Sequence, residues 1–503
     1  MINGRTLIAT CLFGFTLSAG TAGAQTLRIG LSGDPDTLDP TQARTYVSYF
    51  VLTALCGRLF DISPELEIVP QLATGWEWSE DRKGLVIKLR PGVKFHDGEP
   101  FDAAAVKYSI ERHLTMPGSA RRSDIRPITG VEVIDDHTAK IVLSAPFAPL
   151  LAQLAANSGV IVSPKAAQAA GENFGLHPVC AGPFKFAERV PQDRIVLERF
   201  ADYWDKDKIN LDRIVYLPMP DSTVRLANLQ SHGLDIIEQV VPTDLESVRK
   251  DPRLKLAAAN GMGYLGITIN VANGERSKTP LGQDARVRQA LELSIDREVL
   301  SQVVFNGEHP PGNQWVAPTN PYYIKEFPIP ARDVAKAKAL LGAAGVPNPV
   351  AMLTVGTSPV SMQVAQVIQA MAKQSGFDIR IQAIEFVSAL QSVSKGEFEA
   401  FLVSALGRVD PDGNISILLA CNAVFNLGHY CNPEVDRELD VARTLDARAD
   451  RLAHYRIAAE HVLQDTPIIY LYHPKWLYAM SAKLSGFIPY PDGMIRPQGL
   501  RLE

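Results

Sequence analysis

Residues 72–112 read LATGWEWSEDRKGLVIKLRPGVKFHDGEPFDAAAVKYSIER and contain the clearest structural pattern in the chain. Within them, residues 85–89, LVIKL, are rich in apolar and β-branched residues and predict a strand, and Pro91-Gly92 marks a tight turn after it. Asp102 is placed to cap the helix that follows it. We therefore expect the surrounding block, residues 60–175, to form a compact α+β unit of its own.

The sequence on either side of this block predicts α/β structure. Residues 27–31 alternate as an opening strand, and residues 287–295 carry apolar side chains at helical spacing. Helical and strand patterns then alternate over residues 330–405, which predicts a sheet with many parallel strands. With 503 residues, the chain is long enough for two or three domains.

The first 24 residues have the pattern of a secretory signal peptide. Arg5 supplies the positive charge, residues 7–19 are largely apolar, and Ala22-Gly23-Ala24 fits a cleavage site before Gln25. A retained membrane anchor is the alternative, but spanning a bilayer takes about 20 apolar residues. Because the residue directly after the cleavage site is Gln25 and not a cysteine, we expect a freely diffusing periplasmic protein without a lipid anchor.

Composition and motifs disfavour nucleic-acid binding and catalysis. The formal net charge is −5, whereas a nucleic-acid partner calls for a basic patch. No P-loop, H-E-x-x-H or G-x-S-x-G motif is present. Residues 261–266, GMGYLG, match the dinucleotide pattern, but residues 267–271 form a β-branched strand where a helix must face the pyrophosphate. We therefore expect a binding protein that uses no cofactor and no metal, rather than an enzyme.

Four cysteines follow the signal peptide, and an even number in an oxidising compartment predicts disulfides. Cys421 and Cys431 flank a short loop and are expected to pair, which leaves Cys56 to pair with Cys180. The alternative is a metal site made of Cys421, His429 and Cys431, but this spacing matches no usual zinc pattern.

A polar loop at residues 407–414, GRVDPDGN, lies between two apolar runs. Its place after a strand makes it a candidate binding loop, because open α/β sheets bind ligands at the carboxyl ends of their strands. Arg408 can hold a ligand carboxylate or phosphate with two hydrogen bonds, or it can simply pair with Asp410. For Asp412 and Asn414, an ordinary turn that caps the next helix is the simpler interpretation.

Taken together, these motifs resemble the peptide/opine/nickel family of solute-binding proteins of ABC importers, family 5, which includes dipeptide- and oligopeptide-binding proteins. The resemblance covers essentially the whole mature chain, and it is carried by residues 72–112, Gly182-Pro183-Phe184, Asp202-Tyr203-Trp204, Asn270, residues 286–290, Ile295-Asp296-Arg297 and residues 333–345.

The resemblance implies an α/β, periplasmic-binding-protein-like clamshell of two lobes, with an extra α+β domain inserted in the first lobe. Lobe I would combine residues 25–58, 178–264 and 482–503; the extra, family-specific domain would be residues 59–177, and lobe II residues 265–481. The chain would cross between the lobes near Tyr264 to Asn270 and again near Met480. These crossings would act as a hinge, and closure would bury the ligand.

The resemblance also bears on the ligand. In the family's peptide binders, an aspartate shortly before an Asp/Glu-Pro dipeptide pairs with the ammonium group of the peptide, and here Gly407 stands at the matching position. Arg408 follows it and suits an anionic ligand, so we expect Arg408, with Asp410, to contact the ligand. Tyr46, Trp315 and Tyr430 are further candidates, because aromatic residues with polar tips line such clefts; a core role is the alternative for each.

The family's function sets the expected partners. The protein would capture a peptide-like or other small polar solute and deliver it, as a monomer, to an inner-membrane ABC permease with ATPase subunits. One alternative is a periplasmic ligand sensor or chaperone without transport. Another is a receptor for a metal chelate, an opine or haem.

Overall fold

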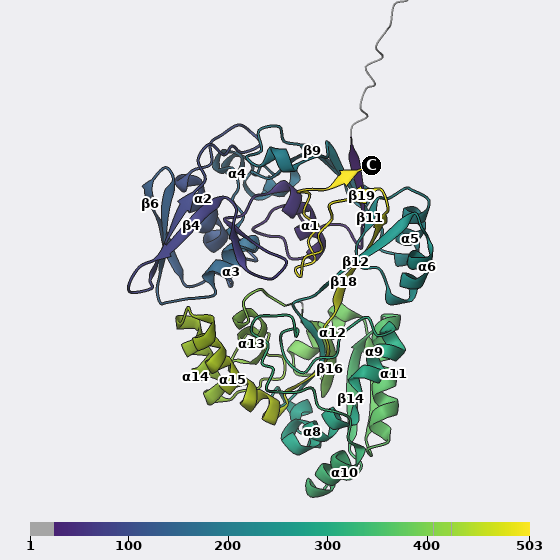
Figure 1. Ribbon diagram of the computed structural model, residues 1–503. Helices are drawn as coiled ribbons and strands as arrows, with labels where there is room; N and C mark the ends of the chain where they lie inside the picture. Colours follow the sequence, from purple (N-terminus) through teal and green to yellow (C-terminus); the bar gives the residue numbers. More distant parts are fainter. Residues whose placement is uncertain (1–24, 406, 424) are drawn as a thin grey trace, which may run out of the picture.

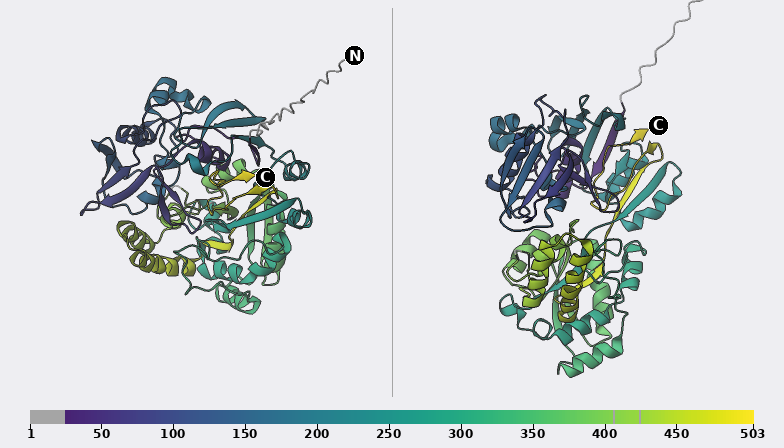
Figure 2. Two further views of the ribbon diagram at one scale, coloured as in Figure 1. Left: turned by 45° about the horizontal axis from the view of Figure 1, so that its top comes forward. Right: turned by 60° about the vertical axis from the view of Figure 1, so that its left-hand side comes forward.

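The computed structural model describes residues 25–405, 407–423 and 425–503, and the expected signal peptide, residues 1–24, lies outside the described residues. Figure 1 shows two lobes one above the other, joined near the middle of the molecule. The upper lobe contains both the start and the end of the described chain, and Figure 2 shows the same division from two other directions. The described residues contain no helix that is both long and apolar enough to cross a membrane.

A seven-stranded sheet forms the centre of lobe I. Its strands, in spatial order, are β12 (Leu254–Asn260), β18 (Lys475–Ser481), β11 (Ile236–Ile237), β1 (Thr26–Leu31), β10 (Arg213–Pro218), β9 (Arg194–Arg199) and β8 (Phe184–Val190). Helices α1 (Tyr46–Leu55), α5 (Ser222–Gln230) and α6 (Leu245–Lys250) accompany it, and β19 (Leu484–Ser485) pairs with β20 (Arg501–Leu502) near the end of the chain. The opening strand predicted at residues 27–31 is therefore near the middle of this sheet, where it pairs in parallel with β10 and β11.

The extra domain is the α+β unit predicted around residues 72–112. Its antiparallel sheet runs in the order β4 (Ala73–Trp78), β5 (Gly84–Leu89), β7 (Thr138–Leu143) and β6 (Ile128–Asp135), with a separate hairpin of β2 (Phe60–Ile62) and β3 (Ile68–Pro70). The helices are α2 (Ala103–Thr115), α3 (Leu150–Leu154) and α4 (Pro164–Ala170). Asp102 caps α2 as expected, because its carboxylate accepts a hydrogen bond of 2.8 Å from the backbone N–H of Ala105.

Lobe II is built on a five-stranded sheet in the order β15 (Asp378–Ile384), β14 (Val350–Gly356), β16 (Ala400–Ala405), β13 (Tyr264–Ile269) and β17 (Ile468–Tyr472). Its helices are α7 (Pro280–Gln283), α8 (Ala285–Ser294), α9 (Arg297–Phe305), α10 (Val334–Ala343), α11 (Pro359–Lys373), α12 (Phe386–Ser394), α13 (Asp412–Leu419), α14 (Pro433–Thr444) and α15 (Arg448–Asp465). The predicted parallel pairing holds for β14 with β15 and β16, but β13 runs antiparallel to both of its neighbours.

The chain crosses between the lobes at two adjacent places. The first crossing links β12 to β13 through residues 261–263, just before the predicted Tyr264 to Asn270, because Tyr264–Ile269 is already strand β13 of lobe II. The second links β17 to β18 through His473 and Pro474. The second crossing was expected near Met480. It lies earlier because residues 475–481 pair along their whole length with β12 of lobe I, so this strand belongs to lobe I and not to lobe II.

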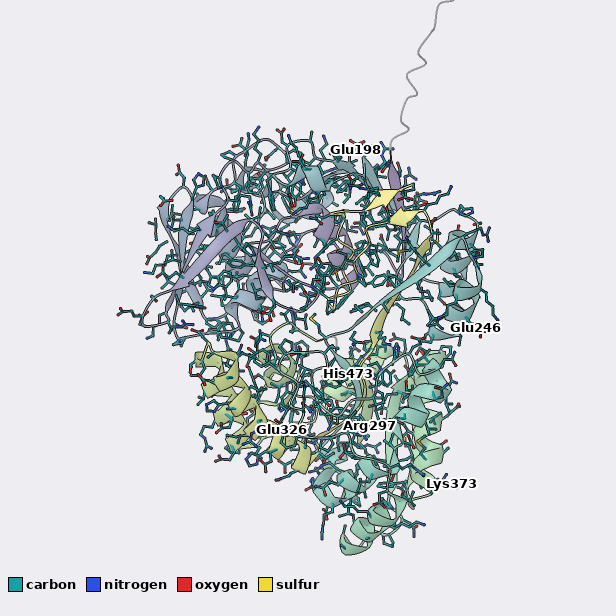
Figure 3. The ribbon with its side chains drawn as sticks, in the orientation of Figure 1. Glu198, Glu246, Arg297, Glu326, Lys373 and His473 are labelled. Carbon is teal, nitrogen blue, oxygen red and sulfur yellow. A yellow bond between two sulfur atoms is a disulfide. The ribbon has the colours of Figure 1, made fainter. Side chains whose placement is uncertain are left out.

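The two crossing segments are bonded to each other. The Nδ1 of His473, which Figure 3 labels at the junction of the lobes, lies 2.7 Å from the carbonyl oxygen of Gly263. The backbone N–H of Gly261 donates to the carbonyl of Pro474 at 2.8 Å, and a Cβ on Gly261 would come within 2.6 Å of that same oxygen. Two short segments that hold each other in this way can bend together, as a hinge does.

Away from the hinge, the extra domain contacts lobe II directly. Arg448 of α15 forms an ion pair of 2.7 Å with Glu67, and Asp446 pairs with Arg82. The backbone N–H of Ala148 donates to the carbonyl of Arg443 at 2.7 Å. The structure therefore shows the lobes in contact on the side opposite the hinge, which is the closed arrangement of a clamshell.

Several histidines are buried as neutral rings. Burial lowers the pKa of His113 to about 3 and that of His473 to about 4. The Nε2 of His113 faces the carbonyl of Val160 at 3.2 Å, so it must carry the proton, and the Nδ1 accepts from the hydroxyl of Thr41 at 2.9 Å. Burial likewise lowers the pKa of His96 and of His309 to about 4.

These histidines predict a loss of stability in mild acid. Below about pH 6.5 the unfolded chain gains protons that the folded chain does not accept until about pH 4, so the free energy of unfolding falls. The loss is about 1.4 kcal/mol per pH unit for each such histidine. Urea unfolding at pH 7.5, 6.5, 5.5 and 4.5 measures it. His113→Gln should give a shallower dependence than the wild type, whereas the exposed His429→Gln should not; parallel profiles for His113→Gln and wild type would contradict the assignment.

Candidate functional site

A cavity of about 760 Å³ lies between the lobes. Its lining comes from all three parts of the molecule, which shows that the cavity is complete only when they meet. Lobe I supplies Arg44, Tyr46, Tyr49, Arg58, Asp492 and Met494; the extra domain supplies Ile62, Gln153 and Asn157; and lobe II supplies, among others, Tyr264, Phe386, Leu390, Val403, Arg408, Asp410, Ile417, Phe425 and Leu427.

Arg408 contributes an available positive charge to the wall of lobe II. Its side chain is 39 % exposed, and its acidic neighbour Asp124, in the extra domain, is 3.6 Å away. At that distance the contact is an ion pair without a hydrogen bond, so the donors of the guanidinium remain available to a ligand. The sequence left open that Arg408 pairs with Asp410. In the structure it does not, because Asp410 pairs with Arg451.

Two glycines shape the loop that carries Arg408. Gly407 has φ of +81°, and a Cβ there would lie 2.2 Å from the backbone of Met262 at the hinge. Gly413 leaves room for the aliphatic stem of Arg408, whose Cγ would lie 2.7 Å from a Cβ at that position. Asn414 then fixes the loop, because its side chain accepts from the N–H of Arg408 and donates to its carbonyl at 2.9 Å.

Two carboxylates line the cavity, those of Asp410 and Asp492, and each forms an ion pair with an arginine that does not line it. Arg451 donates to the two oxygens of Asp410 at 2.6 and 2.7 Å, and Arg496 donates to those of Asp492 at 3.0 and 2.8 Å. Burial opposes the charge of Arg451, but the hydrogen bonds and the charge of Asp410 outweigh it and raise the pKa of that guanidinium. Neither carboxylate is therefore left to attract a positively charged ligand group.

The wall of lobe I adds two arginines and a tyrosine. Arg44 is exposed, and its guanidinium donates only a long bond, 3.4 Å, to the carbonyl of Gly118. Arg58 is buried, which lowers its pKa, and donates to the hydroxyl of Thr53 at 2.8 Å. The ring of Tyr46 stacks on Trp476 with 5.1 Å between centroids. Burial, together with the charge of Asp492, raises the pKa of Tyr46, so its hydroxyl stays protonated and can donate.

The family model described as bacterial extracellular solute-binding proteins, family 5, matches residues 67–426. This range is well over half of the chain and runs from the extra domain past the Arg408 loop. The chain belongs to family 5. This is a family of solute-binding proteins, and the protein is the extracytoplasmic substrate-binding component of an ABC importer.

Curated relatives and solved structures match the family 5 protein over almost its whole length. The glutathione-binding protein GsiB of Pectobacterium atrosepticum is 29 % identical over 98 % of this chain and 97 % of its own. GsiB of Salmonella typhi is 29 % identical over 93 % of each chain. Among solved structures, AgaA from A. tumefaciens R10, in complex with agropinic acid, is 27 % identical with a TM-score of 0.80, over 95 % of this chain and 99 % of that one.

Of the residues suggested as ligand contacts from the sequence, the structure brings Tyr46, Arg408 and Asp410 together at the cavity. It does not bring Trp315 or Tyr430 there. Trp315 is buried in the core of lobe II, and the hydroxyl of Tyr430 donates to the carboxylate of Asp465 at 2.6 Å. Both have the core role considered as the alternative: the ring of Trp315 is buried although its Nε1 has no hydrogen-bond partner among the described residues, and the hydroxyl of Tyr430 is satisfied by Asp465.

The cysteines form the two expected disulfides, Cys56–Cys180 in lobe I and Cys421–Cys431 in lobe II. The second bond removes both thiolates from the alternative metal site with His429. Among the residues that the structure describes, no other group of three metal-ligating side chains is close enough to hold an ion.

Some lining residues were not found from the sequence. Arg44 lies in a loop without a motif, and Phe386, Ile417 and Phe425 look like ordinary apolar positions. The available signal was the position of Phe425 between two cysteines, because an aromatic side chain in a short disulfide-closed loop cannot easily reach a core.

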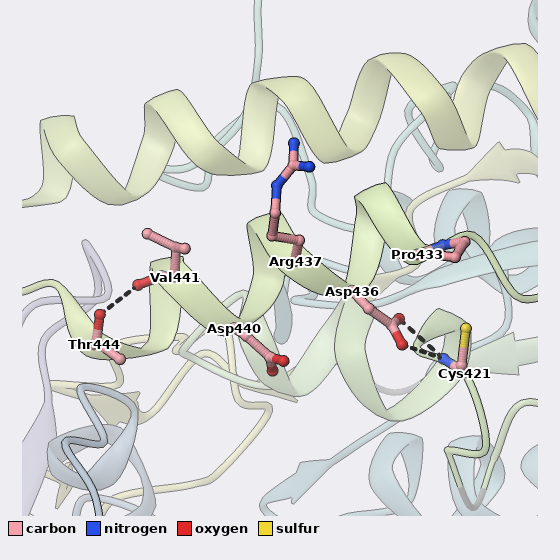
Figure 4. Close-up of a pocket in the computed structure, with 7 residues that line it drawn as sticks. All are labelled: Cys421, Pro433, Asp436, Arg437, Asp440, Val441 and Thr444. Carbon is pink, nitrogen blue, oxygen red and sulfur yellow. Dashed lines mark hydrogen bonds between the residues drawn. The ribbon is translucent and has the colours of Figure 1, made fainter.

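A second hollow lies on the surface of α14, and Figure 4 shows its lining. There the carboxylate of Asp436 accepts from the backbone N–H of Cys421 at 3.0 and 3.2 Å, so it supports the start of the disulfide loop. This hollow shares no lining residue with the interlobe cavity.

The conformation of Gly407 gives a prediction about the loop. Gly407→Ala should lower the free energy of unfolding by at least about 1–2 kcal/mol, because an L-residue is strained at this φ and its Cβ meets the Met262 backbone. Thermal and urea unfolding measure the change. Gly342→Ala is the matched control, because that glycine is in α10 with open space around it and should tolerate alanine. Equal stability of the two variants would show that the loop does not need a glycine.

Proposed function

We propose that the mature protein, cleaved before Gln25, captures a small organic anion in the interlobe cavity. It acts as a monomer and passes the anion to an inner-membrane permease driven by ATPase subunits. The observation that carries the proposal is the charge balance of the cavity wall. Arg451 balances Asp410, and Arg58 and Arg496 together balance Asp61 and Asp492. Arg44 and Arg408 also face the cavity, and neither guanidinium is hydrogen-bonded to a carboxylate among the described residues, so the wall carries excess positive charge.

The placement of the arginines links anion binding to closure. Arg44 belongs to lobe I and Arg408 to lobe II, so an anion between them is attracted by both only when the lobes are closed. A ligand shifts a two-state protein toward the state that it binds more tightly. The closed state would then be the form that the permease recognises.

The comparisons support this ligand class. The relatives named above are described as binding glutathione, and the AgaA structure holds agropinic acid. Both ligands carry carboxylates, which supports an anion site; glutathione also carries an ammonium group, so the argument against an ammonium group rests on this chain's own cavity. The replacement of a side chain by Gly407 at the place where the family's peptide binders hold an ammonium group also favours an acid over an ordinary peptide.

The test is binding of defined probes to the mature protein. Thermal shift and calorimetry would compare glutathione, agropinic acid, free dipeptides and N-acetylated dipeptides. We expect the acids without a free ammonium group to bind best. Arg408→Ala should weaken their binding about 10- to 100-fold, because a hydrogen bond to a charged group contributes about 1.5–3 kcal/mol.

Arg380→Ala is the matched control. It also removes an arginine of lobe II that pairs with one carboxylate, but its partner Asp378 is in the same strand β15 and Arg380 does not line the cavity, so the affinity for the acids should change little. The proposal fails if Arg408→Ala binds the acids as the wild type does, or if free dipeptides bind more tightly than the acids without an ammonium group.

A further inference from the structure

Three large apolar side chains that line the cavity are exposed to solvent. Phe386 is 49 %, Ile417 36 % and Phe425 58 % exposed, although the lobes are in contact. They belong to the start of α12, to α13 and to the loop between Cys421 and Cys431. Apolar side chains gathered on one wall of a cavity lose contact with water only when a ligand covers them, which is a usual source of binding free energy. We name Phe386, Ile417 and Phe425 the apolar wall.

The apolar wall rests on a packed base. Beneath it lies a small core cluster made of Ala389, Val393, Phe398 and Phe401, with Leu390, Val403 and Leu427 packed against it. Leu390, Val403 and Leu427 also line the cavity, so the apolar surface continues from the exposed wall into the protein.

The disulfide loop holds Phe425 in place. The backbone N–H of Phe425 donates to the carbonyl of Ile417 at 3.2 Å, which joins two members of the wall. Asn426 closes the loop from inside, because its side chain donates to the carbonyls of Ala420 and Tyr430 at 3.0 and 2.6 Å. With the Cys421–Cys431 bond around it, the loop has few alternative conformations, and a ligand meets a preformed surface.

The charges of the same cavity restrict what can cover this wall. The cations Arg44 and Arg408 are available, whereas Asp410 and Asp492 are already paired. A ligand with an ammonium group would therefore bury it without a carboxylate partner among the described lining residues, and that is costly. A ligand with a carboxylate and an apolar chain satisfies both walls.

We propose that the solute is an amphipathic acid of the N-acyl amino acid type, with its carboxylate at Arg408 and Arg44 and its acyl chain on the apolar wall. This rests on the anion site proposed above and adds the second half of the ligand. In an N-acyl amino acid the nitrogen is an uncharged amide, so the molecule brings no positive charge into the cavity.

The test is a series of N-acetyl-, N-butanoyl-, N-hexanoyl- and N-octanoylglycine, measured by calorimetry on the mature wild-type protein. Affinity should rise about twofold to fourfold for each added methylene, as expected for burial of apolar surface. 6-Aminohexanoylglycine has the same chain with a terminal ammonium group. It should bind at least tenfold more weakly than N-hexanoylglycine, because the charge would lie on the apolar wall.

Variants separate the two halves of the site. Phe425→Ala and Ile417→Ala should flatten the rise with chain length and leave N-acetylglycine nearly unchanged. Arg408→Ala should weaken every member of the series by a similar factor and keep the rise. Ile488→Ala is the control, because this side chain is 53 % exposed but does not line the cavity. Unfolding of each ligand-free variant checks that the fold is intact.

The possible failures are distinguishable. If affinity does not rise with chain length while Arg408→Ala still weakens the binding of acids, the apolar subsite is wrong and the anion site stands. If affinity rises with chain length but the uncharged N-acylglycinamides bind equally well, the anion site is wrong. If Phe425→Ala and Ile417→Ala keep the full rise, the chain does not lie on the apolar wall.

Discussion

The ion pair between Asp410 and Arg451 is the interaction on which the binding cleft depends. Arg451 also donates to the hydroxyl groups of Tyr455 and Tyr322 at 2.8 and 3.1 Å and to the carbonyl of Ala442 at 3.1 Å, so the buried guanidinium is fully engaged. Removing one partner of such a buried pair costs about 3–5 kcal/mol, because the other charge is left without compensation. The pair fixes the loop that presents Arg408, and it also cancels the negative charge of the wall on which Arg408 stands.

This arrangement gives each lobe a different task. Lobe I offers Arg44 and Tyr46, whereas lobe II offers Arg408 and the apolar wall of Phe386, Ile417 and Phe425. The extra domain closes the far side, where Glu67 meets Arg448. A solute that contacts both lobes therefore adds its own binding free energy to that of the contacts between lobe II and the extra domain. Small differences in the solute can then decide whether the closed state predominates.

Local patterns predicted much of the fold but only part of the site. The capped helix after Asp102, the strand at residues 85–89 and the Cys421–Cys431 disulfide follow from short-range rules, and the structure has all of them. The Cys56–Cys180 disulfide was predicted only as the remaining pair, and the structure has it too. The place of β18 did not follow, because an apolar strand can pair equally well in either sheet until its neighbours are known. Whether Trp315 and Tyr430 belong to the cleft or to the core did not follow either, for a related reason. The sequence shows an aromatic ring with a polar tip, but not that Trp315 will be buried in the core of lobe II or that Asp465 will accept from the hydroxyl of Tyr430.

The sequence by itself identified the family through its motifs and placed Arg408 in a polar loop, because these depend on patterns within short stretches of chain. The two-lobe plan followed from the family resemblance and not from periodicity. Only the tertiary structure decided the sign of the charge on the cavity wall and which side of the cavity is apolar. Asp410 meets Arg451 across 41 positions of sequence, and Arg408 meets Asp124 of another domain. Whether a charge is free or neutralised depends on such distant partners, since electrostatic contacts follow distance in space and not separation along the chain.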